Sequence, residues 1–443
     1  MTNLSRLLYQ LADSMRRLRW DKSKLVRYQE KRLRNIVNHA YASVSFYHRW
    51  FKEAGINPSD IKRLGDLAKI PIVTRNEFRR LESEDVVSQR VSVANLKPLT
   101  TSGSTGRPLK LFISEAEDDW RKAVYMRANI CCGQKPRDKW VVIAGPRHFG
   151  STTKLQTVLG IYAQTCISVF DYVSTQASKI RSLKPDVLDG YSSSILLLAK
   201  QIQTTGQKAI RPRIVFGNAE VVDGSSREYI EKVFDAPYYD QYGCVEFNRT
   251  AWQCSERKNY HMDVDSVITQ FVDKDGNEVS AGERGEIIQT SLFNYAMPFI
   301  RYEVGDVGVP SDDECSCGRR LPLMKTVEGR TDSLVVLPDG RILSPRTLTV
   351  AVNMFDQYES IEQFRIVQKE LNLLEILVET SNAAIDKRAM ETSLVAHINR
   401  TLHLDEAKMT LRAKVVDNIP PGKSGKSMIV ASELSGASAL PTR

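Results

Sequence analysis

The spacing of apolar and polar residues divides the chain into regions with different periodicity. From residue 1 to about residue 85, apolar positions recur at helical intervals, as at Leu7, Leu11, Met15 and Leu18, and strand signals are few. This pattern predicts a helical N-terminal segment.

The middle of the chain alternates short apolar runs with longer stretches of helical character. Residues 109–113, 140–145 and 214–217 have the composition of buried strands, and the last of them ends at a glycine. Strands that alternate with helices are typical of an α/β core. We therefore predict an α/β fold for the main body of the protein.

The pattern changes again after about residue 332. Residues 362–380 predict two strands around the polar turn 369–372, and residues 411–416 predict a last strand. Between them, a helix over 385–403 is predicted by an i, i+4 stripe formed by Met390, Leu394, Ile398 and Leu402. The chain is thus expected to have a large N-terminal domain, 1–331, and a small α+β C-terminal domain, 332–443.

Length and composition agree with a globular protein of more than one domain. The chain has 443 residues, of which 42% are hydrophobic and 26% charged. No apolar run approaches the roughly 20 residues that span a bilayer, and the first residues lack the apolar stretch of a secretory signal. The expected location is the cytoplasm.

The net charge of +9 is concentrated near the N-terminus. Residues 4–36 contain ten Lys or Arg against three acidic residues. A basic amphipathic helix can lie on an anionic membrane surface, or it can be the solvated face of an ordinary helix, and both interpretations stay open. No nucleic-acid-binding motif accompanies the charge, so no nucleic-acid partner is predicted.

A loop rich in glycine and hydroxyl residues is the first candidate for chemistry. It covers 100–108, and its centre is Ser102, Gly103, Ser104, Thr105 and Gly106. Glycines allow close approach of the backbone to an anion, and successive N–H groups can bind phosphate. The alternative is a flexible surface loop. The Walker A spacing is absent.

Other segments offer groups that suit a nucleotide. Glu246 follows the aromatic stretch 239–242 and could bind Mg²⁺, which commonly takes one or two carboxylates. Asp306 follows Gly305 and could point its oxygens at a ribose. Each of these acids, taken alone, could equally be an ordinary loop residue.

Taken in order, these segments resemble the adenylate-forming superfamily of acyl-CoA synthetases. The resemblance is greatest to the phenylacetate–CoA ligase branch, with its CapK-like and coenzyme F390 synthetase-like members. It also includes 41–48, 67–71, 217–220, 329–332 and 424–426, so it extends over nearly the whole chain.

The resemblance implies a role for each matching position. Ser102 to Gly106 would enclose the ATP phosphates, and Glu246 would bind Mg²⁺. Asp306 would bind the ribose, with Arg330 beside it. Asp332 would be the hinge to a mobile C-terminal domain, and Lys426 the lysine that meets the α-phosphate. The adenine and part of the acyl pocket would be lined by Gly217, Asn218, Ala219, Glu220, Gln241, Tyr242 and Gly243.

The implied activity is ATP-dependent conversion of a carboxylic acid to an acyl-AMP and then to a CoA thioester. Two departures from the family pattern bear on it. Cys244 and Val245 precede Glu246 where many relatives have a hydroxyl residue, and the usual arginines are absent after Lys426. The alternative is an adenylylating or amide-forming transferase of the same superfamily, similar to coenzyme F390 synthetase or to CapK of polysaccharide biosynthesis.

The cysteines indicate a second, metal-binding site. Cys254 and His261 form a Cys-x6-His pair, and Cys315 and Cys317 form a Cys-x-Cys pair followed by Gly318. Four such ligands suit a closed, tetrahedral structural zinc site, and zinc-binding members of the ligase branch are similar at these positions. Reduced, unligated cysteines are the alternative.

Neither the acid nor the final acceptor is predicted by the sequence. The segment 144–150, with His148 and Phe149, would suit an aromatic or small polar acid, or it is simply a loop at a strand end. The expected partners are a small carboxylic acid and CoA. The chain could also associate with a second copy of itself as a homodimer.

Overall fold

The computed structural model describes residues 3–100, 109–146, 154–206, 210–220, 222, 224–328, 335–343, 345–380, 385–417, 419 and 429–434. They form two compact units. The first contains the described residues of 3–100, 110–135 and 239–328, and the second those of 136–238 and 335–434.

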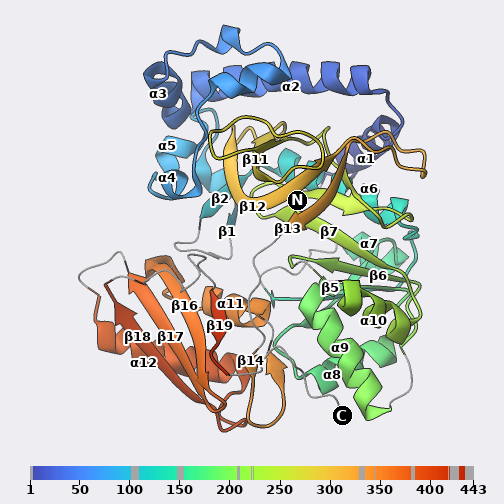
Figure 1. The fold of residues 1–443 in the computed structure, drawn as a ribbon, viewed down its shortest axis with the longest axis vertical. Helices are drawn as coiled ribbons and strands as arrows, with labels where there is room; N and C mark the ends of the chain where they lie inside the picture. The colour runs from blue at the N-terminus through green and yellow to red at the C-terminus, as the bar shows by residue number, and fades with distance from the viewer. Residues whose placement is uncertain are drawn as a thin grey trace. The chain divides into compact units, whose positions relative to one another are not determined.

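Helices make up the beginning of the first unit, as the N-terminal pattern predicts (Figure 1). Asn3, Asp21 and Ser114 accept backbone N–H bonds at the starts of α1, α2 and α6, which fixes where these helices begin. The helices are α1 (Leu4–Arg17), α2 (Lys22–Ser43), α3 (Ser45–Glu53), α4 (Arg75–Arg79), α5 (Ser83–Val86) and α6 (Glu115–Cys131), with 3-10 turns at Pro58–Asp60, Leu64–Lys69 and Val93–Asn95.

A buried ionic network attaches α1 to the rest of this unit. Arg17 Nε donates to Asp265 Oδ2 at 2.7 Å, and Arg127 of α6 donates to both Asp265 Oδ2, at 2.7 Å, and Asp263 Oδ1, at 2.6 Å. Burial opposes ionisation of Asp265, but Arg127 and Arg17 outweigh it and lower its pKa to about 2. Removing one member would leave a buried charge without its counter-ion, so the network fixes the docking of the N-terminal helix.

An antiparallel sheet carries the chemistry-bearing loops of the first unit. Its strand order is β10-β11-β12-β13-β9-β8-β7, and a separate antiparallel pair joins β1 to β2. The strands are β1 (Lys97–Thr100), β2 (Lys110–Ile113), β7 (Tyr238–Cys244), β8 (Asn248–Gln253), β9 (Tyr260–Met262), β10 (Val267–Val272), β11 (Gly285–Ser291), β12 (Tyr302–Ser311) and β13 (Leu323–Glu328).

A parallel sheet with the order β6-β5-β3-β4 organises the first part of the second unit. The apolar runs that predict strands at 140–145 and 214–217 form β3 and β6, and helix α9 lies against β5 and β6. The elements are β3 (Trp140–Ala144), α7 (Lys154–Leu159), β4 (Gln164–Ser168), α8 (Val173–Leu183), β5 (Val187–Tyr191), α9 (Ser192–Thr205), β6 (Ile214–Asn218) and α10 (Gly224–Phe234).

The C-terminal part of the second unit is the predicted α+β region. Its sheet has the order β18-β17-β16-β19 (Figure 1). The predicted stripe Met390, Leu394, Ile398 and Leu402 is buried in its core. The elements are β14 (Val335–Val336), β15 (Ile342–Leu343), α11 (Pro345–Asn353), β16 (Ile361–Glu370), β17 (Leu373–Thr380), α12 (Lys387–Leu402), β18 (Thr410–Val416) and β19 (Val430–Ser432), with a 3-10 turn at Tyr358–Ser360.

The predicted α/β class is therefore confirmed, together with the strands and the helix expected from the apolar pattern. The domain boundary at 331/332 stays a prediction, because 329–334 lie outside the described residues. Val350 of α11 belongs to the same apolar cluster as Val141 and Ile143 of β3. Within the described residues, no helix is long and apolar enough to cross a membrane.

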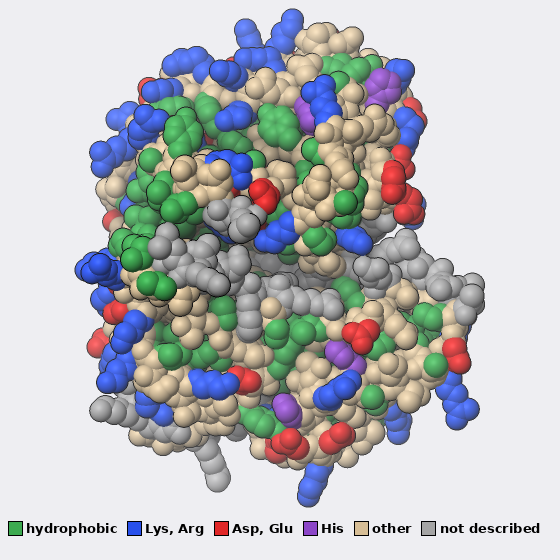
Figure 2. All heavy atoms as spheres, turned by 180° about the vertical axis from the view of Figure 1, so that it is seen from behind, with side chains coloured by type: hydrophobic (Ala, Val, Ile, Leu, Met, Phe, Trp, Pro, Cys, Tyr) green, Lys and Arg blue, Asp and Glu red, His purple; other side chains and the backbone are tan. Residues whose placement is uncertain are grey.

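The basic N-terminal region uses its apolar stripe for internal packing. Leu7 and Leu18 are buried, and α1 packs on α6, where Arg6 pairs with the buried Asp119 at 2.6 Å. Figure 2 shows Lys and Arg side chains gathered along the upper edge, where α2 lies in Figure 1. A second set of apolar side chains on α1 faces solvent and consists of Leu4, Leu8 and Tyr9.

Candidate functional site

The turn between β7 and β8 places Glu246 inside the first unit. Arg121 of α6 donates to the backbone carbonyls of Val245, at 2.6 Å, and Glu246, at 3.2 Å. Asn294 Nδ2 donates to the Glu246 carbonyl as well, at 3.1 Å. The backbone of this turn is thus fixed from two other segments of the chain.

The Glu246 side chain is buried, with 3% of the residue exposed, and its two oxygens have different surroundings. Oε1 accepts hydrogen bonds from Arg75 Nη2, at 3.3 Å, and from the Tyr302 hydroxyl, at 3.1 Å. Oε2 has no hydrogen-bond partner among the described residues. A buried carboxylate oxygen without a partner is costly unless a cation or donor reaches it, so Glu246 fits the predicted role of Mg²⁺ ligand.

The groups around Glu246 shift one another's pKa values. Burial opposes the charged guanidinium of Arg75, but attraction to Glu246 outweighs burial and raises the pKa of Arg75. Burial and the Glu246 carboxylate together raise the pKa of Tyr302, and the same two causes raise the pKa of Cys244. Tyr302 therefore remains a neutral donor, and Cys244 a neutral thiol beside the carboxylate.

Asp306, the predicted ribose ligand, lies near this group on β12. The Tyr242 hydroxyl donates to Asp306 Oδ2 at 3.0 Å, and burial followed by the charge of Asp306 raises the pKa of Tyr242. Gln241, the residue before Tyr242, is buried, and its side-chain amide donates to Asn129 Oδ1 at 2.9 Å. Gly243 is needed for close approach of β7 and β8, because a Cβ there would lie 2.2 Å from the Asn248 carbonyl oxygen.

The predicted segment 217–220 lies in the second unit and is described separately. A Cβ on Gly217 would lie 1.8 Å from the Tyr238 hydroxyl oxygen, so only glycine fits this strand end. Asn218 Nδ2 donates to the buried Asp189 at 2.9 Å. Ala219 has a left-handed φ of 67°, and Glu220 Oε2 accepts the Ser193 N–H at the start of α9, at 2.9 Å. Such a strained, tightly bonded turn is typical of a ligand-binding segment.

Several predicted residues cannot be placed in this geometry. They are Ser102, Gly103, Ser104, Thr105, Gly106, Arg330, Asp332 and Lys426, which lie outside the described residues. The acyl-pocket segment 144–150 is described only to Pro146. The roles of these residues stay predictions.

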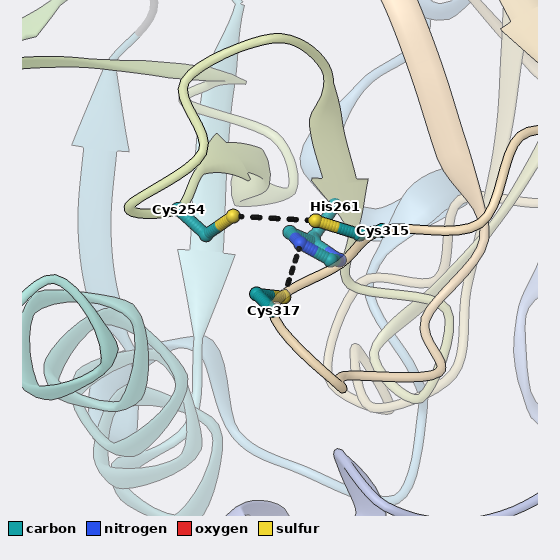
Figure 3. Close-up of side chains that lie close together, drawn as sticks. All are labelled: Cys254, His261, Cys315 and Cys317. Atoms are coloured by element: carbon teal, nitrogen blue, oxygen red, sulfur yellow. Dashed lines mark hydrogen bonds between the residues drawn. The ribbon is translucent and has the colours of Figure 1, made fainter.

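The four predicted zinc ligands lie together (Figure 3): Cys254 in the β8–β9 connection, His261 in β9, and Cys315 and Cys317 in the β12–β13 connection. Their ligand atoms all lie within 4.8 Å of one another. Cys254 Sγ is 3.5 Å from Cys315 Sγ, and Cys317 Sγ is 3.3 Å from His261 Nε2. In a tetrahedron with usual zinc bond lengths, neighbouring sulfurs would be about 3.8 Å apart and a sulfur and nitrogen about 3.5 Å apart. These two distances are close to the tetrahedral values, so the four residues could hold a zinc ion.

The electrostatics of this cluster differ among its four members, since burial raises the pKa of Cys254 to about 12 and also raises the pKa of Cys315, whereas His261 and Cys317 are suited to a metal. Burial, with the nearby Arg319, lowers the pKa of His261 to about 4, so its imidazole is neutral at physiological pH. Burial opposes the Cys317 thiolate, but hydrogen bonds from Arg319 outweigh burial and lower its pKa. Gly318 has a φ of 78°, which explains why glycine follows Cys317 in this turn.

Sequence reasoning missed the residues that fix Glu246. Tyr302 lies four positions before Asp306, a predicted site residue, so its neighbourhood gave a signal. Arg75 and Arg121 gave none, since Arg75 and Glu246 are 171 positions apart and only the folded chain brings them together.

Comparison with known proteins bears on the fold. The solved structure of 2-hydroxyisobutyryl-CoA ligase with 2-HIB-AMP and CoA in the thioesterification state has a TM-score of 0.65 and 22% identity, covering 94% of this chain and 92% of that one. The structure in the postadenylation state with R3-HIB-AMP has a TM-score of 0.63 and 21% identity, covering 94% and 91%. The chain has the fold of this CoA ligase.

Curated relatives confirm the resemblance to the phenylacetate–CoA ligase and CapK branch. Phenylacetate-coenzyme A ligase of Thermus thermophilus is 24% identical over 426 residues, covering 92% of this chain and 95% of the relative. The enzyme of the same name from Escherichia coli is 25% identical over 388 residues, covering 83% and 85%. Protein CapK of Staphylococcus aureus is 22% identical over 434 residues, covering 94% and 90%. No protein family model matches the chain.

Proposed function

We propose that the protein is an AMP-forming acid–thiol ligase that activates a carboxylic acid with ATP and transfers the acyl group to CoA. One observation carries the proposal. Glu246 is buried, two donors bind its Oε1, and its Oε2 has no partner among the described residues, so Oε2 has lone pairs that a metal ion could use. The acid Asp306, bound by Tyr242, supports a ribose contact in the same unit.

The reaction has two steps. The carboxylate oxygen of the substrate attacks the α-phosphorus of ATP, and the bond to the β-phosphate oxygen breaks, so that pyrophosphate leaves with the electron pair. The thiol of CoA, after losing its proton to solvent, then attacks the acyl carbon, and AMP leaves. Mg²⁺ bound by Glu246 would offset the phosphate charge.

The chain's own groups have complementary tasks in this scheme. Lys426 would stabilise the negative charge that grows on the α-phosphate during the first attack. Asp306 would orient the ribose, and 217–220 would position the adenine. Residues 102–106 would bind the β- and γ-phosphates, Arg330 would lie beside the ribose, and Asp332 would let the C-terminal domain move between the steps.

Exchange of labelled pyrophosphate into ATP across a panel of aryl and short carboxylic acids tests the first step. We expect exchange with at least one acid, and Lys426→Ala should lower its rate by about 100-fold or more. Lys423→Ala, in the same segment, is the matched control and should exchange normally. Exchange with no acid in the panel, or full activity in Lys426→Ala, would contradict the assignment.

A second acceptor chemistry is supported by the likeness to CapK and by the residues around Lys426 and Glu246. The resemblance leads us to expect a hydroxyl residue before Glu246 and arginines soon after Lys426, whereas this chain has Cys244 and Val245 at the first place and Ser427 to Val430 at the second. The alternative product is an amide or an adenylylated hydroxyl. Mass spectrometry decides: an acyl-CoA formed only when CoA is present supports the ligase, whereas acid-dependent AMP release without CoA consumption supports the alternative.

We further propose that Cys254, His261, Cys315 and Cys317 bind a structural zinc ion. The distances between their ligand atoms and the neutral state of His261 support a closed site with four protein ligands. A closed set leaves no coordination position for substrate, so the metal would stabilise the fold and take no part in acyl transfer.

We also propose that this protein is located in the cytoplasm. There it would contact the surface of anionic membranes through α1 and α2. The support is the exposed set Leu4, Leu8 and Tyr9 beside exposed basic residues such as Arg16 and Arg19. Co-sedimentation with phosphatidylserine vesicles tests it, and unchanged binding in Leu8→Glu would contradict it. Analytical ultracentrifugation separately tests the predicted homodimer.

A further inference from the structure

Two side chains bond a single oxygen of Glu246, and the other oxygen has no hydrogen-bond partner in the part of the chain that the structure describes. Arg75 and Tyr302 come from α4 and β12, far apart in the chain, and both donate to Oε1. Arg75 is largely buried, with 15% of its side chain exposed, and Tyr302 is fully buried. The two donors therefore approach the same oxygen from different elements inside a protected environment.

The backbone of Glu246 is fixed independently of its side chain. Its carbonyl accepts from Arg121 and from Asn294, and the carbonyl of Val245 accepts from Arg121. With the backbone anchored, the remaining freedom of Glu246 is rotation about its side-chain bonds. The bonds to Arg75 and Tyr302 restrict that rotation, because they hold Oε1, whereas the buried Oε2 has no hydrogen-bond partner among the described residues.

A carboxylate restrained in this way can offer a cation one oxygen but not both. This distinction matters between the two common hard divalent cations. Mg²⁺ takes six ligands in near-ideal octahedral geometry and is commonly bound through one or two carboxylates. Ca²⁺ takes six to eight oxygens in flexible geometry and readily accepts both oxygens of one carboxylate.

We propose that Arg75 and Tyr302 are positioning residues that make Glu246 a one-oxygen ligand and thereby set the preference of the nucleotide site for Mg²⁺ over Ca²⁺. This inference rests on the proposed function, in which Glu246 binds the metal of ATP. Arg75 and Tyr302 act through Glu246, and neither of them touches the metal. Releasing Oε1 would let the carboxylate turn, which weakens the geometry for Mg²⁺ and relieves the restriction against Ca²⁺.

The test is equilibrium binding of ATP to the full-length protein by isothermal titration calorimetry, without an acid substrate. ATP is supplied fully complexed with Mg²⁺, fully complexed with Ca²⁺, or metal-free in EDTA. The variants are Tyr302→Phe, Arg75→Lys and Arg75→Gln. Tyr47→Phe is the matched control, since its buried hydroxyl accepts the Ile300 N–H at 2.9 Å in the same region and does not touch Glu246.

We expect the wild type to bind Mg²⁺–ATP more tightly than Ca²⁺–ATP. Tyr302→Phe and Arg75→Gln should weaken Mg²⁺–ATP by about 10-fold or more, the usual effect of losing a partner of a metal ligand, with a much smaller change for Ca²⁺–ATP. Arg75→Lys, which keeps the positive charge, should retain part of the preference for Mg²⁺–ATP over Ca²⁺–ATP. Metal-free ATP should bind all variants and the wild type alike, and Tyr47→Phe should keep the wild-type ratio.

Two negative results are distinguishable. If the wild type binds ATP in none of the three forms, the proposed function fails. If the wild type prefers Mg²⁺–ATP but Tyr302→Phe and Arg75→Gln weaken both metal complexes equally, then these residues have only a structural role and the inference is overturned.

Discussion

Tyr242 donates its hydroxyl hydrogen to Oδ2 of Asp306, and the two oxygens are 3.0 Å apart. The bond orients the acid assigned to the ribose. Asp306→Asn would replace charge-assisted hydrogen bonds to the ribose hydroxyls, which contribute roughly 1.5–3 kcal/mol each, by neutral ones. We expect the Kd of ATP to rise about 10- to 100-fold, with a smaller rise for Tyr242→Phe. Titration calorimetry measures both, and the exposed Asp275→Asn serves as control. Unchanged ATP binding in Asp306→Asn would remove this acid from the site.

The ring of Tyr238 lies so close to Gly217 that it leaves no room for a side chain at position 217. A Cβ there would lie 1.8 Å from the tyrosine oxygen and 2.3 Å from its Cζ, so Gly217→Ala must displace a buried ring. We expect a loss of about 1–3 kcal/mol in the free energy of unfolding. Gly224→Ala is the matched control, because nothing lies within 4 Å of a Cβ at that position. Denaturant unfolding of both variants measures the difference, and equal stabilities would show that the ring moves freely.

Glu117 of α6 is a buried acid that has no hydrogen-bond partner for either carboxylate oxygen among the described residues. Burial raises its pKa to about 8, with Arg121 opposing only in part. The folded state thus binds a proton that the unfolded state releases between about pH 4.5 and about pH 8. Because the folded state binds more protons in this window, stability falls as pH rises through it.

Glu117→Gln should abolish this loss. Relative to the wild type, we expect the variant to gain up to about 1.4 kcal/mol per pH unit across the window, as measured by denaturant unfolding at a series of pH values. For the control Glu53→Gln, at an exposed position, the free energy of unfolding should vary with pH in the same way as for the wild type. Parallel curves for Glu117→Gln would mean that Glu117 is ionised in the folded protein at neutral pH.

The cluster of Cys254, His261, Cys315 and Cys317 predicts about one zinc per chain in protein expressed with zinc supplied. Cys315→Ser should lower the zinc content well below this value and lower the melting temperature, because metal binding contributes to folding free energy. Cys166→Ser, outside the cluster, should change neither. Elemental analysis with thermal unfolding measures both quantities, and a zinc-free wild type of normal stability would refute the site.

Much of the fold follows from local patterns. The stripe Met390, Leu394, Ile398 and Leu402 predicts α12 within two residues at the start and one at the end, since a buried helix needs an apolar residue about every turn. The strands β3 and β6 follow in the same way from their unbroken apolar runs. The N-terminal helices are also predicted by their apolar pattern, but the pattern does not tell whether the apolar stripe packs inside the protein or faces a membrane. Leu7 and Leu18 pack against the protein, and Arg17 reaches Asp265, 248 positions away.

The sequence by itself determined the α/β class, the succession of helices and strands, and which residue types are candidates for phosphate, ribose, Mg²⁺ and zinc. These are properties of short segments, where periodicity and spacing carry the information. Only the tertiary structure decided that Cys254 and His261 meet Cys315 and Cys317, that Tyr242 bonds Asp306, and that Arg75 and Tyr302 share one oxygen of Glu246. Those relationships join residues up to 171 positions apart, and they form only when distant segments pack into a common interior, where a paired polar group costs less free energy than an unpaired one.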